Sequence, residues 1–308
     1  MANLKTLAER EEKKRKFESG HSLCSGCGLP IAVRTILNSV EGPVVASNAT
    51  GCLEVATTRF PTSAWNIPWI HNAFENAAAT ISGAESAYRA LKRKGKIKQD
   101  INFVAFAGDG GTYDIGLQSL SGALERGHDF TYVTLDNGAY MNTGIQRSSA
   151  TPKGASTTTA PAGEEKYGKQ EKRKNLTEIV AAHGIPYVGQ ASISHLTDLS
   201  NKAEKAFNKN GPTFLNVLST CQLGWRVPPE KSIEVAQKGV DTCFWPLYEV
   251  DEGEYNLTYE PKEKLPVEEW LKPQKRFAAL FKVANRDVVD EIQNDVDEDW
   301  EKLKAKSS

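Results

Sequence analysis

The feature of this sequence that most constrains its fold is an alternation of short apolar runs with longer segments of helical periodicity. Five apolar runs predict strands, at 43–50, 101–111, 130–137, 185–192 and 212–221. Four longer segments between them predict helices, at 74–95, 114–127, 176–184 and 195–211. Because strand–helix–strand crossovers join parallel strands, this order predicts an α/β fold on a doubly wound, mostly parallel sheet. Such sheets bind ligands at the carboxyl ends of their strands.

Two parts of the chain interrupt this alternation. Residues 150–175 are rich in Thr, Gly, Ala, Pro and charge and predict a long surface loop, with the segment 163–175 exposed. After about residue 225, prolines and aromatic residues recur without a regular period, which predicts an irregular extension and no further unit of the sheet. We therefore expect an N-terminal arm (1–20), an α/β domain (21–225) and a C-terminal extension (226–308) that packs on that domain or on a partner.

Length, charge and hydropathy exclude several classes of protein. The chain has 308 residues, 39% of them hydrophobic, which is enough for a sizeable core. A formal net charge of −1 gives no electrostatic case for a nucleic-acid or anionic-membrane partner. The start of the sequence lacks the apolar core of a signal peptide, and no window approaches the length of a membrane span. We expect a cytoplasmic protein that binds neither nucleic acid nor membrane.

A glycine-rich motif ends the strand predicted at 101–111, and it consists of Gly108, Asp109, Gly110 and Gly111. Its glycines let the backbone approach a phosphate closely, and Asp109 supplies a hard carboxylate. Asn137 ends the next predicted strand, and the turn beyond it exposes carbonyls such as that of Ala139. Oxygen ligands from two adjacent strand ends, completed by diphosphate oxygens and a water molecule, suit six-coordinate Mg²⁺.

Either glycine-containing turn alone has a simple structural explanation, as a tight connection after a strand. The paired spacing is more informative, because GDG followed by Asn 25–30 residues later resembles the thiamine-diphosphate motif of ThDP-dependent enzymes. Two competing phosphate motifs are absent from the sequence: G-x-x-x-x-G-K-[ST], and G-x-G-x-x-G with a correctly placed acidic partner.

The cysteines predict a second cofactor. Five cysteines, an odd number in a sequence without an export signal, fit metal or redox chemistry better than a disulfide framework. Cys24 and Cys27 form a C-x-x-C pair, whereas Cys52 and Cys221 follow predicted strands and are expected at the same edge as Asp109. Four converging thiolates can bind a tetrahedral Zn²⁺ or a [4Fe–4S] cluster, and their geometry does not decide between the two.

The neighbouring ThDP motif favours the cluster. A redox cluster has a purpose beside a cofactor that generates electron-rich intermediates, and a structural zinc does not. Cys243, in the predicted extension, is expected to be an ordinary buried thiol.

Longer segments of the sequence resemble one family closely. The segments are CSGCG, NATGCLEV, PWIHNAFENAAA, GDGGTYDIGLQSLSGALERGHD, DNGAYMNTGIQRSSATPKGA, NLTEIVAAHGIPYV and GWRVPPEKSIEVA. They resemble the β subunits of archaeal and bacterial pyruvate:ferredoxin oxidoreductases, within the wider 2-oxoacid:ferredoxin oxidoreductase family, over about residues 18–280. The resemblance implies a heteromeric enzyme with α-type and γ/δ-type subunits. Such an enzyme cleaves a 2-oxoacid on ThDP and passes single electrons through clusters to ferredoxin.

The same resemblance assigns roles to individual residues. It implies one [4Fe–4S] cluster on Cys24, Cys27, Cys52 and Cys221. It places Asp109, Asn137 and the carbonyl of Ala139 on Mg²⁺, and Asn142 opposite the reacting carbon of the cofactor. Thr50 and Gly51 are expected to line the cofactor beside the cluster.

The substrate remains open at this stage. Pyruvate with coenzyme A would yield acetyl-CoA and CO₂, whereas relatives on the same scaffold use oxalate without coenzyme A, 2-oxoglutarate or branched 2-oxoacids. The carboxylate that activates ThDP belongs to the partner chain in this family, and Glu75 is expected to be only a first-turn helix acid. Two rival hypotheses are a ThDP decarboxylase or carboligase subunit with a structural zinc, and a non-catalytic scaffold.

Overall fold

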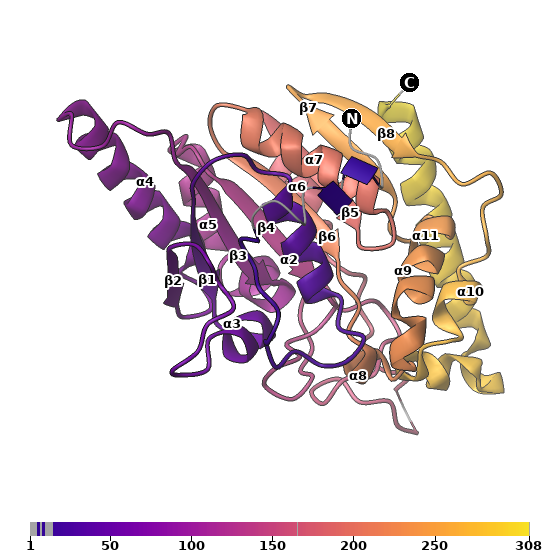
Figure 1. The fold of residues 1–308 in the computed structure, drawn as a ribbon. Helices are drawn as coiled ribbons and strands as arrows, with labels where there is room; N and C mark the ends of the chain where they lie inside the picture. The colour runs from indigo at the N-terminus through magenta and orange to yellow at the C-terminus, as the bar shows by residue number, and fades with distance from the viewer. Residues whose placement is uncertain (1–4, 7, 10–14, 165, 308) are drawn as a thin grey trace.

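The computed structural model describes residues 5–6, 8–9, 15–164 and 166–307 and contains one mixed sheet (Figure 1). The strands are β1 (Val44–Ala49), β2 (Trp69–Asn72), β3 (Asn102–Gly108), β4 (Thr131–Asp136), β5 (Tyr187–Ser192), β6 (Thr213–Leu218), β7 (Leu247–Asp251) and β8 (Glu254–Tyr259). Their order across the sheet is β2-β1-β3-β4-β6-β5-β7-β8. Strands β1 to β6 pair in parallel, and β7 and β8 pair antiparallel. The predicted α/β class with a mostly parallel sheet is confirmed.

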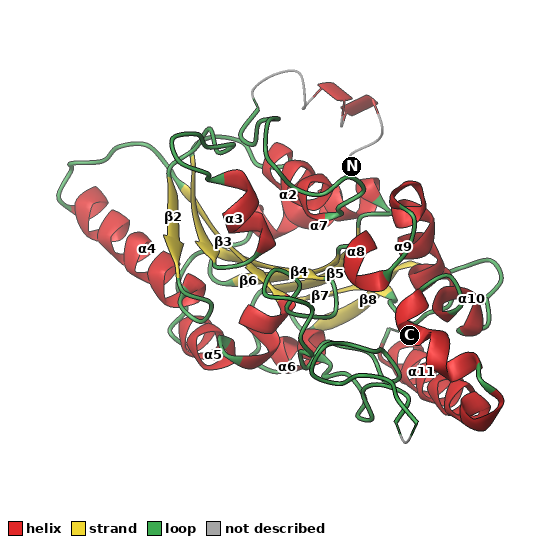
Figure 2. Cartoon of the chain, turned by 90° about the horizontal axis from the view of Figure 1, so that it is seen from below, coloured by secondary structure: helices red, strands yellow, loops and turns green. Residues whose placement is uncertain are grey.

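Helices cover both faces of the sheet. They are α2 (Leu29–Asn38), α3 (Cys52–Thr57), α4 (Ala77–Arg93), α5 (Leu117–Glu125), α6 (Leu176–Ala181), α7 (Leu196–Asn208), α8 (Gln222–Trp225), α9 (Ser232–Asp241), α10 (Glu268–Leu271) and α11 (Arg286–Lys306). Figure 2 shows α2 and α7 on one side of the strands and α4, α5 and α6 on the other. A sheet covered on both faces needs nearly continuous apolar strands, which explains why all six residues of β4 are buried.

The carboxyl ends of the parallel strands form one edge of the molecule. The short helices α3 and α8, which directly follow β1 and β6, both lie on the lower side of Figure 1. The parallel register sets Gly108, at the end of β3, beside Leu135 of β4. Residues that follow β1, β3, β4 and β6 therefore share this edge, as the sequence predicted.

The expectation that the chain after residue 225 adds nothing to the sheet is wrong. Strands β7 and β8 continue the sheet beyond β5 as an antiparallel hairpin. The turn at Glu252 and Gly253 has positive φ at both positions, which is the geometry of a two-residue hairpin turn. Exposure alternates along β8, so its pattern was readable as an edge strand with one face covered.

The loop predicted at 150–175 contains no helix or strand among its described residues, but much of it is not on the surface. Ala155 is fully buried, and Lys169, within the segment predicted to be exposed, is 2% exposed. The ammonium of Lys169 donates to the carbonyl of Thr151 at 2.6 Å, and a buried lysine is tolerated when such acceptors surround it. The prediction of an exposed segment is therefore wrong at its centre.

The predicted N-terminal arm lies partly outside the described residues, which include only 5–6, 8–9 and 15–20 of it.

Among the helices that the structure describes, none combines the length and apolar character needed to span a membrane. Figure 1 shows α9, α10 and α11 grouped beside β7 and β8.

Candidate active site

A cavity lies at the carboxyl ends of β1, β3 and β4, and every predicted cofactor residue lines it. These residues are Thr50, Gly51, Gly108, Asp109, Gly110, Gly111, Asn137, Ala139 and Asn142. The side chain of Cys52 and that of Tyr140 complete much of the wall. The structure therefore brings together residues that are separated by up to 92 positions in the sequence, 50 to 142.

Three oxygen-bearing groups converge inside this cavity. One terminal atom of the Asn137 amide lies 3.1 Å from Oδ1 of Asp109 and 3.0 Å from the carbonyl oxygen of Ala139. With nitrogen in that position, the amide donates a hydrogen bond to both oxygens. With oxygen there, the Asn137 oxygen lies about 3 Å from each of the other two oxygens, which is the separation of neighbouring ligands around an octahedral Mg²⁺ with bonds of about 2.1 Å. The donor set and its spacing fit this ion.

Asp109 is a buried carboxylate without a basic partner. It is 1% exposed, accepts a hydrogen bond from the hydroxyl of Ser148, and receives the backbone N–H of Asn137 at 3.4 Å. No ion pair joins it to a basic side chain in the part of the chain that the structure describes. Burial raises the pKa of Asp109, and the charge of nearby Asp136 raises it further. A bound cation would supply the missing compensation for the buried charge.

The glycines of the cavity lack a side chain for different structural reasons. A Cβ at Gly110 would lie 2.2 Å from the ring of Tyr140, so this position has no room for a side chain. A Cβ at Gly108 or Gly51 would meet no atom within 4 Å and would project into open space. Only the latter two therefore leave a space that a ligand could occupy. The π-helical turn Gly110–Asp114 follows directly, a local geometry that is frequent at functional sites.

The four predicted cysteine ligands approach the same edge. The backbone N–H of Gly28, next to Cys27, donates to the carbonyl of Thr220, next to Cys221, at 2.9 Å. Burial raises the pKa of the Cys27 thiol to about 12 and that of Cys52 to about 11, and the other thiols of the set add to both shifts. Within the described ranges, no three His, Cys, Asp or Glu side chains are close enough together to hold a single metal ion.

Several polar atoms beside these thiols lack partners. Within the described structure, the hydroxyl of Thr220 and the side-chain oxygen of Gln222, on either side of Cys221, are buried and have no hydrogen-bond partner. Asn142 lines the same cavity as Cys52 and lowers the pKa of its thiol, against the larger effect of burial. Cys243, by contrast, is 4% exposed and packs in the core, as predicted.

Trp225 is a residue of this site that the sequence did not identify. Its indole N–H donates to the carbonyl of Asn137 at 2.6 Å, and its backbone N–H donates to the carbonyl of Cys221 at 2.9 Å. The guanidinium of Arg276, from the C-terminal extension, lies 4.2 Å from the Trp225 ring. Trp225 therefore links the backbone of Asn137, one of the three oxygen-bearing residues, to the backbone of Cys221, one of the predicted [4Fe–4S] ligands.

We expect Trp225→Phe to lower the free energy of unfolding by about 1–3 kcal/mol more than a matched change, because the buried Asn137 carbonyl loses its donor. Trp270→Phe is the matched control. Trp270 is equally buried, but its indole N–H has no partner among the described residues. Urea unfolding of both variants measures the difference. Equal losses in the two variants would show that the hydrogen bond contributes nothing.

Glu75 does not occupy the position expected for it. Helix α4 begins at Ala77 with Asn76 as its N-cap, so Glu75 precedes the helix and is not in its first turn. It is also absent from the wall of the cavity around Asp109. The prediction of a first-turn acid is wrong by two residues.

Comparison with known proteins gives a consistent picture. A family model described as "Thiamine pyrophosphate enzyme, C-terminal TPP binding domain" matches residues 49–217. "Pyruvate synthase subunit PorB" of Thermotoga maritima is 52% identical and aligns with 98% of this chain and 95% of its own length. The protein of the same name from Methanocaldococcus jannaschii is 51% identical over 93% and 95% of the two chains.

Two further similarities widen the comparison. "Ketoisovalerate oxidoreductase subunit VorB" of Pyrococcus furiosus is 43% identical, with 94% of this chain and 92% of that protein aligned. A solved structure of 2-oxoglutarate:ferredoxin oxidoreductase from Magnetococcus marinus superposes with a TM-score of 0.56 at 21% identity. The superposition covers 73% of this chain and 81% of that one, and at this identity it supports the fold alone.

Proposed function

This chain belongs to the thiamine-pyrophosphate enzymes, as a 2-oxoacid:ferredoxin oxidoreductase subunit of the pyruvate synthase type, and from that premise we propose that it carries both cofactors of the reaction. It binds ThDP with Mg²⁺ and one [4Fe–4S] cluster. The reaction is the oxidative decarboxylation of pyruvate to acetyl-CoA and CO₂, with electrons passed to ferredoxin. The single observation that carries the cofactor proposal is the convergence of Asp109, Asn137 and Ala139 at the spacing of magnesium ligands.

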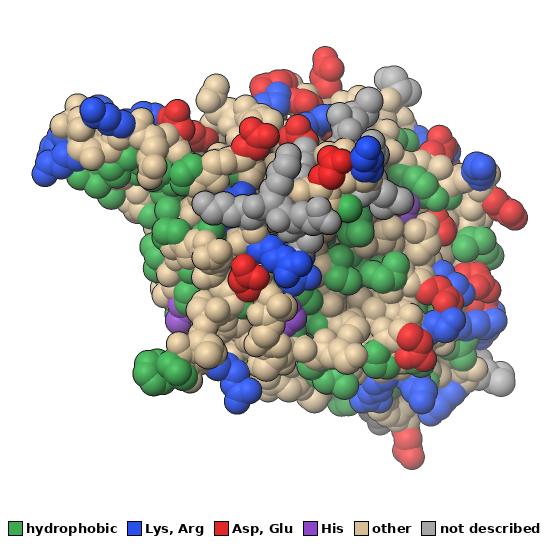
Figure 3. Space-filling view, viewed as in Figure 1, with side chains coloured by type: hydrophobic (Ala, Val, Ile, Leu, Met, Phe, Trp, Pro, Cys, Tyr) green, Lys and Arg blue, Asp and Glu red, His purple; other side chains and the backbone are tan. Residues whose placement is uncertain are grey.

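The residues of the cavity have distinct tasks toward the cofactor. Asp109, Asn137 and the carbonyl of Ala139 hold the ion that binds the diphosphate. Gly108 and Gly51 leave the space in which it lies. When bound there, ThDP would supply the electron sink that decarboxylation of a 2-oxoacid requires. Figure 3 shows acidic and basic side chains interspersed on one face, without a broad surface of one sign.

The four cysteines hold the cluster beside this cavity. Cys52 lines the cavity itself, so one cluster ligand borders the cofactor. The unpartnered hydroxyl of Thr220 is available to donate a hydrogen bond to a cluster or cysteine sulfur, a contact that tunes the reduction potential. A structural zinc would explain the thiols but not their position against the wall of a ThDP site.

Partner chains complete the site. The cavity encloses only about 50 Å³, whereas sites that bury small ligands usually enclose about 300–1,000 Å³. The cofactor would therefore be covered from outside, by an α-type subunit that also brings the activating carboxylate. Exposed apolar residues flank two of the predicted cluster ligands, Val55 near Cys52 and Leu223 near Cys221, at 46% and 63% exposure. They suit docking of γ/δ-type subunits or ferredoxin.

We expect Asn142→Ala to retain ThDP and lose turnover by at least tenfold, because Asn142 lines the cavity with Cys52 and does not belong to the oxygen cluster. ThDP content and kcat of the assembled enzyme are measured together. Loss of ThDP in proportion to activity would move Asn142 from a catalytic to a cofactor-holding role.

The proposal is tested by anaerobic purification of the assembled enzyme, with iron, sulfide and ThDP analysis. Ferredoxin reduction is then assayed with pyruvate, 2-oxoglutarate, branched 2-oxoacids and oxalate, each with and without coenzyme A. We expect pyruvate with coenzyme A to give the highest kcat/KM. Reduction by oxalate alone, without coenzyme A, would contradict the substrate and leave the family unchanged.

A further inference from the structure

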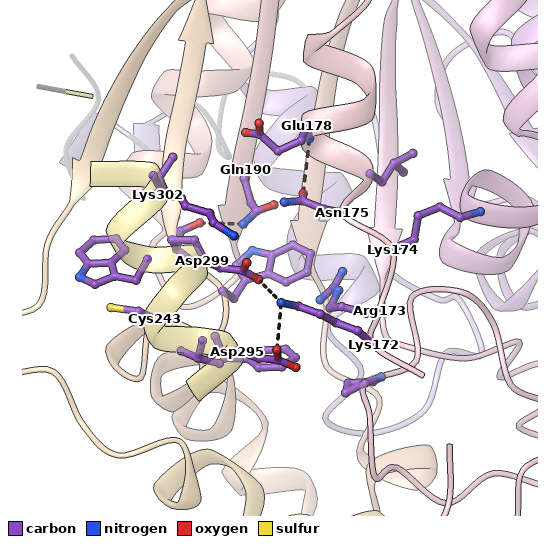
Figure 4. Close-up of a pocket in the computed structure, with 18 of the residues that line it drawn as sticks. Lys172, Arg173, Lys174, Asn175, Glu178, Gln190, Cys243, Asp295, Asp299 and Lys302 are labelled. Atoms are coloured by element: carbon purple, nitrogen blue, oxygen red, sulfur yellow. Dashed lines mark hydrogen bonds and ion pairs between the residues drawn. The ribbon is translucent and has the colours of Figure 1, made fainter. Parts of the chain in front are cut away.

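A second cavity, of about 580 Å³, lies between the C-terminal helix α11, the interior strands β5 and β7, and the loop before α6 (Figure 4). It shares no lining residue with the cavity at Asp109. Its walls are largely apolar, and they include Phe244, Trp245, Tyr248, Ile292, Val296 and Trp300. Its volume falls within the range of about 300–1,000 Å³ that is usual for small-molecule sites.

Helix α11 covers this cavity without filling it. The apolar residues on its inner face include Ile292, Val296 and Leu303, and all three line the hollow. Ion pairs at the rim join α11 to the body of the protein: Lys172 lies 3.4 Å from Asp295 and 3.0 Å from Asp299. Figure 4 shows these two contacts crossing from the loop to the helix. Partly exposed pairs of this kind contribute only about 0–1 kcal/mol each, so an apolar ligand would add substantially to the contacts that hold α11.

Arg173 lies at the inner end of the cavity. Its guanidinium is 4.6 Å from the ring of Trp245, and its Nη2 donates to Asp136 and to the hydroxyl of Tyr113, at 2.7 and 2.8 Å. Both hydrogen bonds leave from one nitrogen. Among the described residues, neither Nε nor Nη1 of Arg173 has a hydrogen-bond acceptor. Both fork edges of a guanidinium include Nη2, which is already occupied, so Nη1 is the nitrogen that remains to donate to a ligand anion.

Two further polar groups of the wall are available to a ligand. Five of the six lysines and arginines that line the cavity form ion pairs, whereas Lys174 has no ion pair among the described residues and its ammonium donates to the carbonyl of Tyr113. Asn216 is 1% exposed, lines the same cavity, and its Oδ1 has no partner within the described structure. This oxygen could accept a hydrogen bond from a hydroxyl or amide group on a ligand.

We propose that this cavity binds a small amphipathic organic acid. Its aromatic or alkyl body lies against Trp245, Trp300 and the inner face of α11, and its carboxylate or sulfonate group accepts a hydrogen bond from Nη1 of Arg173. The site is separate from the active-site cavity, because the two cavities have no lining residue in common.

The test uses 8-anilinonaphthalene-1-sulfonate as a fluorescent probe on the full-length chain. We expect one binding site per chain, displacement by decanoate, and at least tenfold weaker displacement by decyltrimethylammonium. Val296→Trp and Leu303→Trp each fill the hollow and should weaken probe binding at least tenfold. Two filling variants are used so that a folding defect in one, detected by circular dichroism, does not decide the outcome. Arg173→Lys, which keeps the charge and removes Nη1, should weaken decanoate at least fivefold.

The control is Phe60→Ser, which removes a large apolar side chain that is 98% exposed and far along the chain from α11. Probe affinity in this variant should be unchanged. Undiminished binding in both filling variants, or equal displacement by the cationic amphiphile, would overturn the proposal. Loss of the probe site in the assembled enzyme would also overturn it, because a partner chain would then fill the hollow.

Discussion

We expect Asp109→Ala to abolish retention of Mg²⁺ and ThDP while the chain remains folded. Asp109 supplies the only carboxylate of the oxygen cluster, so its removal leaves two neutral oxygens for a divalent ion. The fold should survive because Asp109 forms no ion pair within the described residues, and its hydroxyl partner Ser148 also contacts Thr151. The loss of cofactor affinity should exceed a hundredfold.

The measurement is the rise in thermal unfolding temperature on adding Mg²⁺ and ThDP. A ligand present at 100 times its Kd stabilises the folded state by about 2.7 kcal/mol, and this increment should vanish in the variant. Asp129→Ala is the matched control. Asp129 accepts the backbone N–H of Gly211 at the opposite end of the sheet. A normal ThDP stoichiometry in Asp109→Ala would remove Asp109 from the cofactor site.

The second large effect concerns the cluster. Replacing Cys24, Cys27, Cys52 or Cys221 by serine should remove or destabilise the [4Fe–4S] cluster, whereas Cys243→Ser should not. The pKa values of Cys27, Cys52 and Cys221 are each raised in part by other thiols of the set, and Cys24 contributes to all three. The four sulfurs therefore lie near one another. Cys243 is buried in the core beside a different cavity.

Iron and acid-labile sulfide per chain, together with absorbance near 400 nm, distinguish the outcomes after anaerobic purification. We expect iron to fall from about four per chain to below one in the ligand variants. Colourless wild-type protein with one zinc per chain would favour the structural zinc. An intact cluster in Cys52→Ser together with cluster loss in Cys243→Ser would overturn the ligand assignment.

The parallel sheet and its binding edge could be predicted because both depend on local patterns. Buried strands such as β3 and β4 appear as continuous apolar runs, and the residues that follow them are then placed by topology. This reasoning brought Asp109 and Asn137 to one edge without any knowledge of their contacts. It could not separate the glycines, because the ring that excludes a side chain at Gly110 comes from Tyr140, 30 residues away.

The features that were missed depend on long-range contacts. Trp225 donates to a carbonyl 88 residues earlier, from a helix of only four residues whose periodicity is too short to detect. Lys169 carries a charge and so predicts exposure, but backbone carbonyls of its own loop accept its hydrogen bonds. The β7–β8 hairpin could have been predicted from the alternating exposure pattern of β8. The prolines on either side of the hairpin and its aromatic residues obscured that signal.

The central claim is that this chain carries the cofactors but cannot complete the reaction alone. The direct test is anaerobic viologen reduction by the purified chain, reconstituted with cluster, Mg²⁺ and ThDP, with and without its α-type partner. We predict no 2-oxoacid oxidation by the chain alone and restored turnover with the partner. Glu75, the nearest candidate for an internal activating carboxylate, lies outside the cavity wall. Sustained turnover by the isolated chain would contradict the account, because the activating carboxylate would then belong to this sequence.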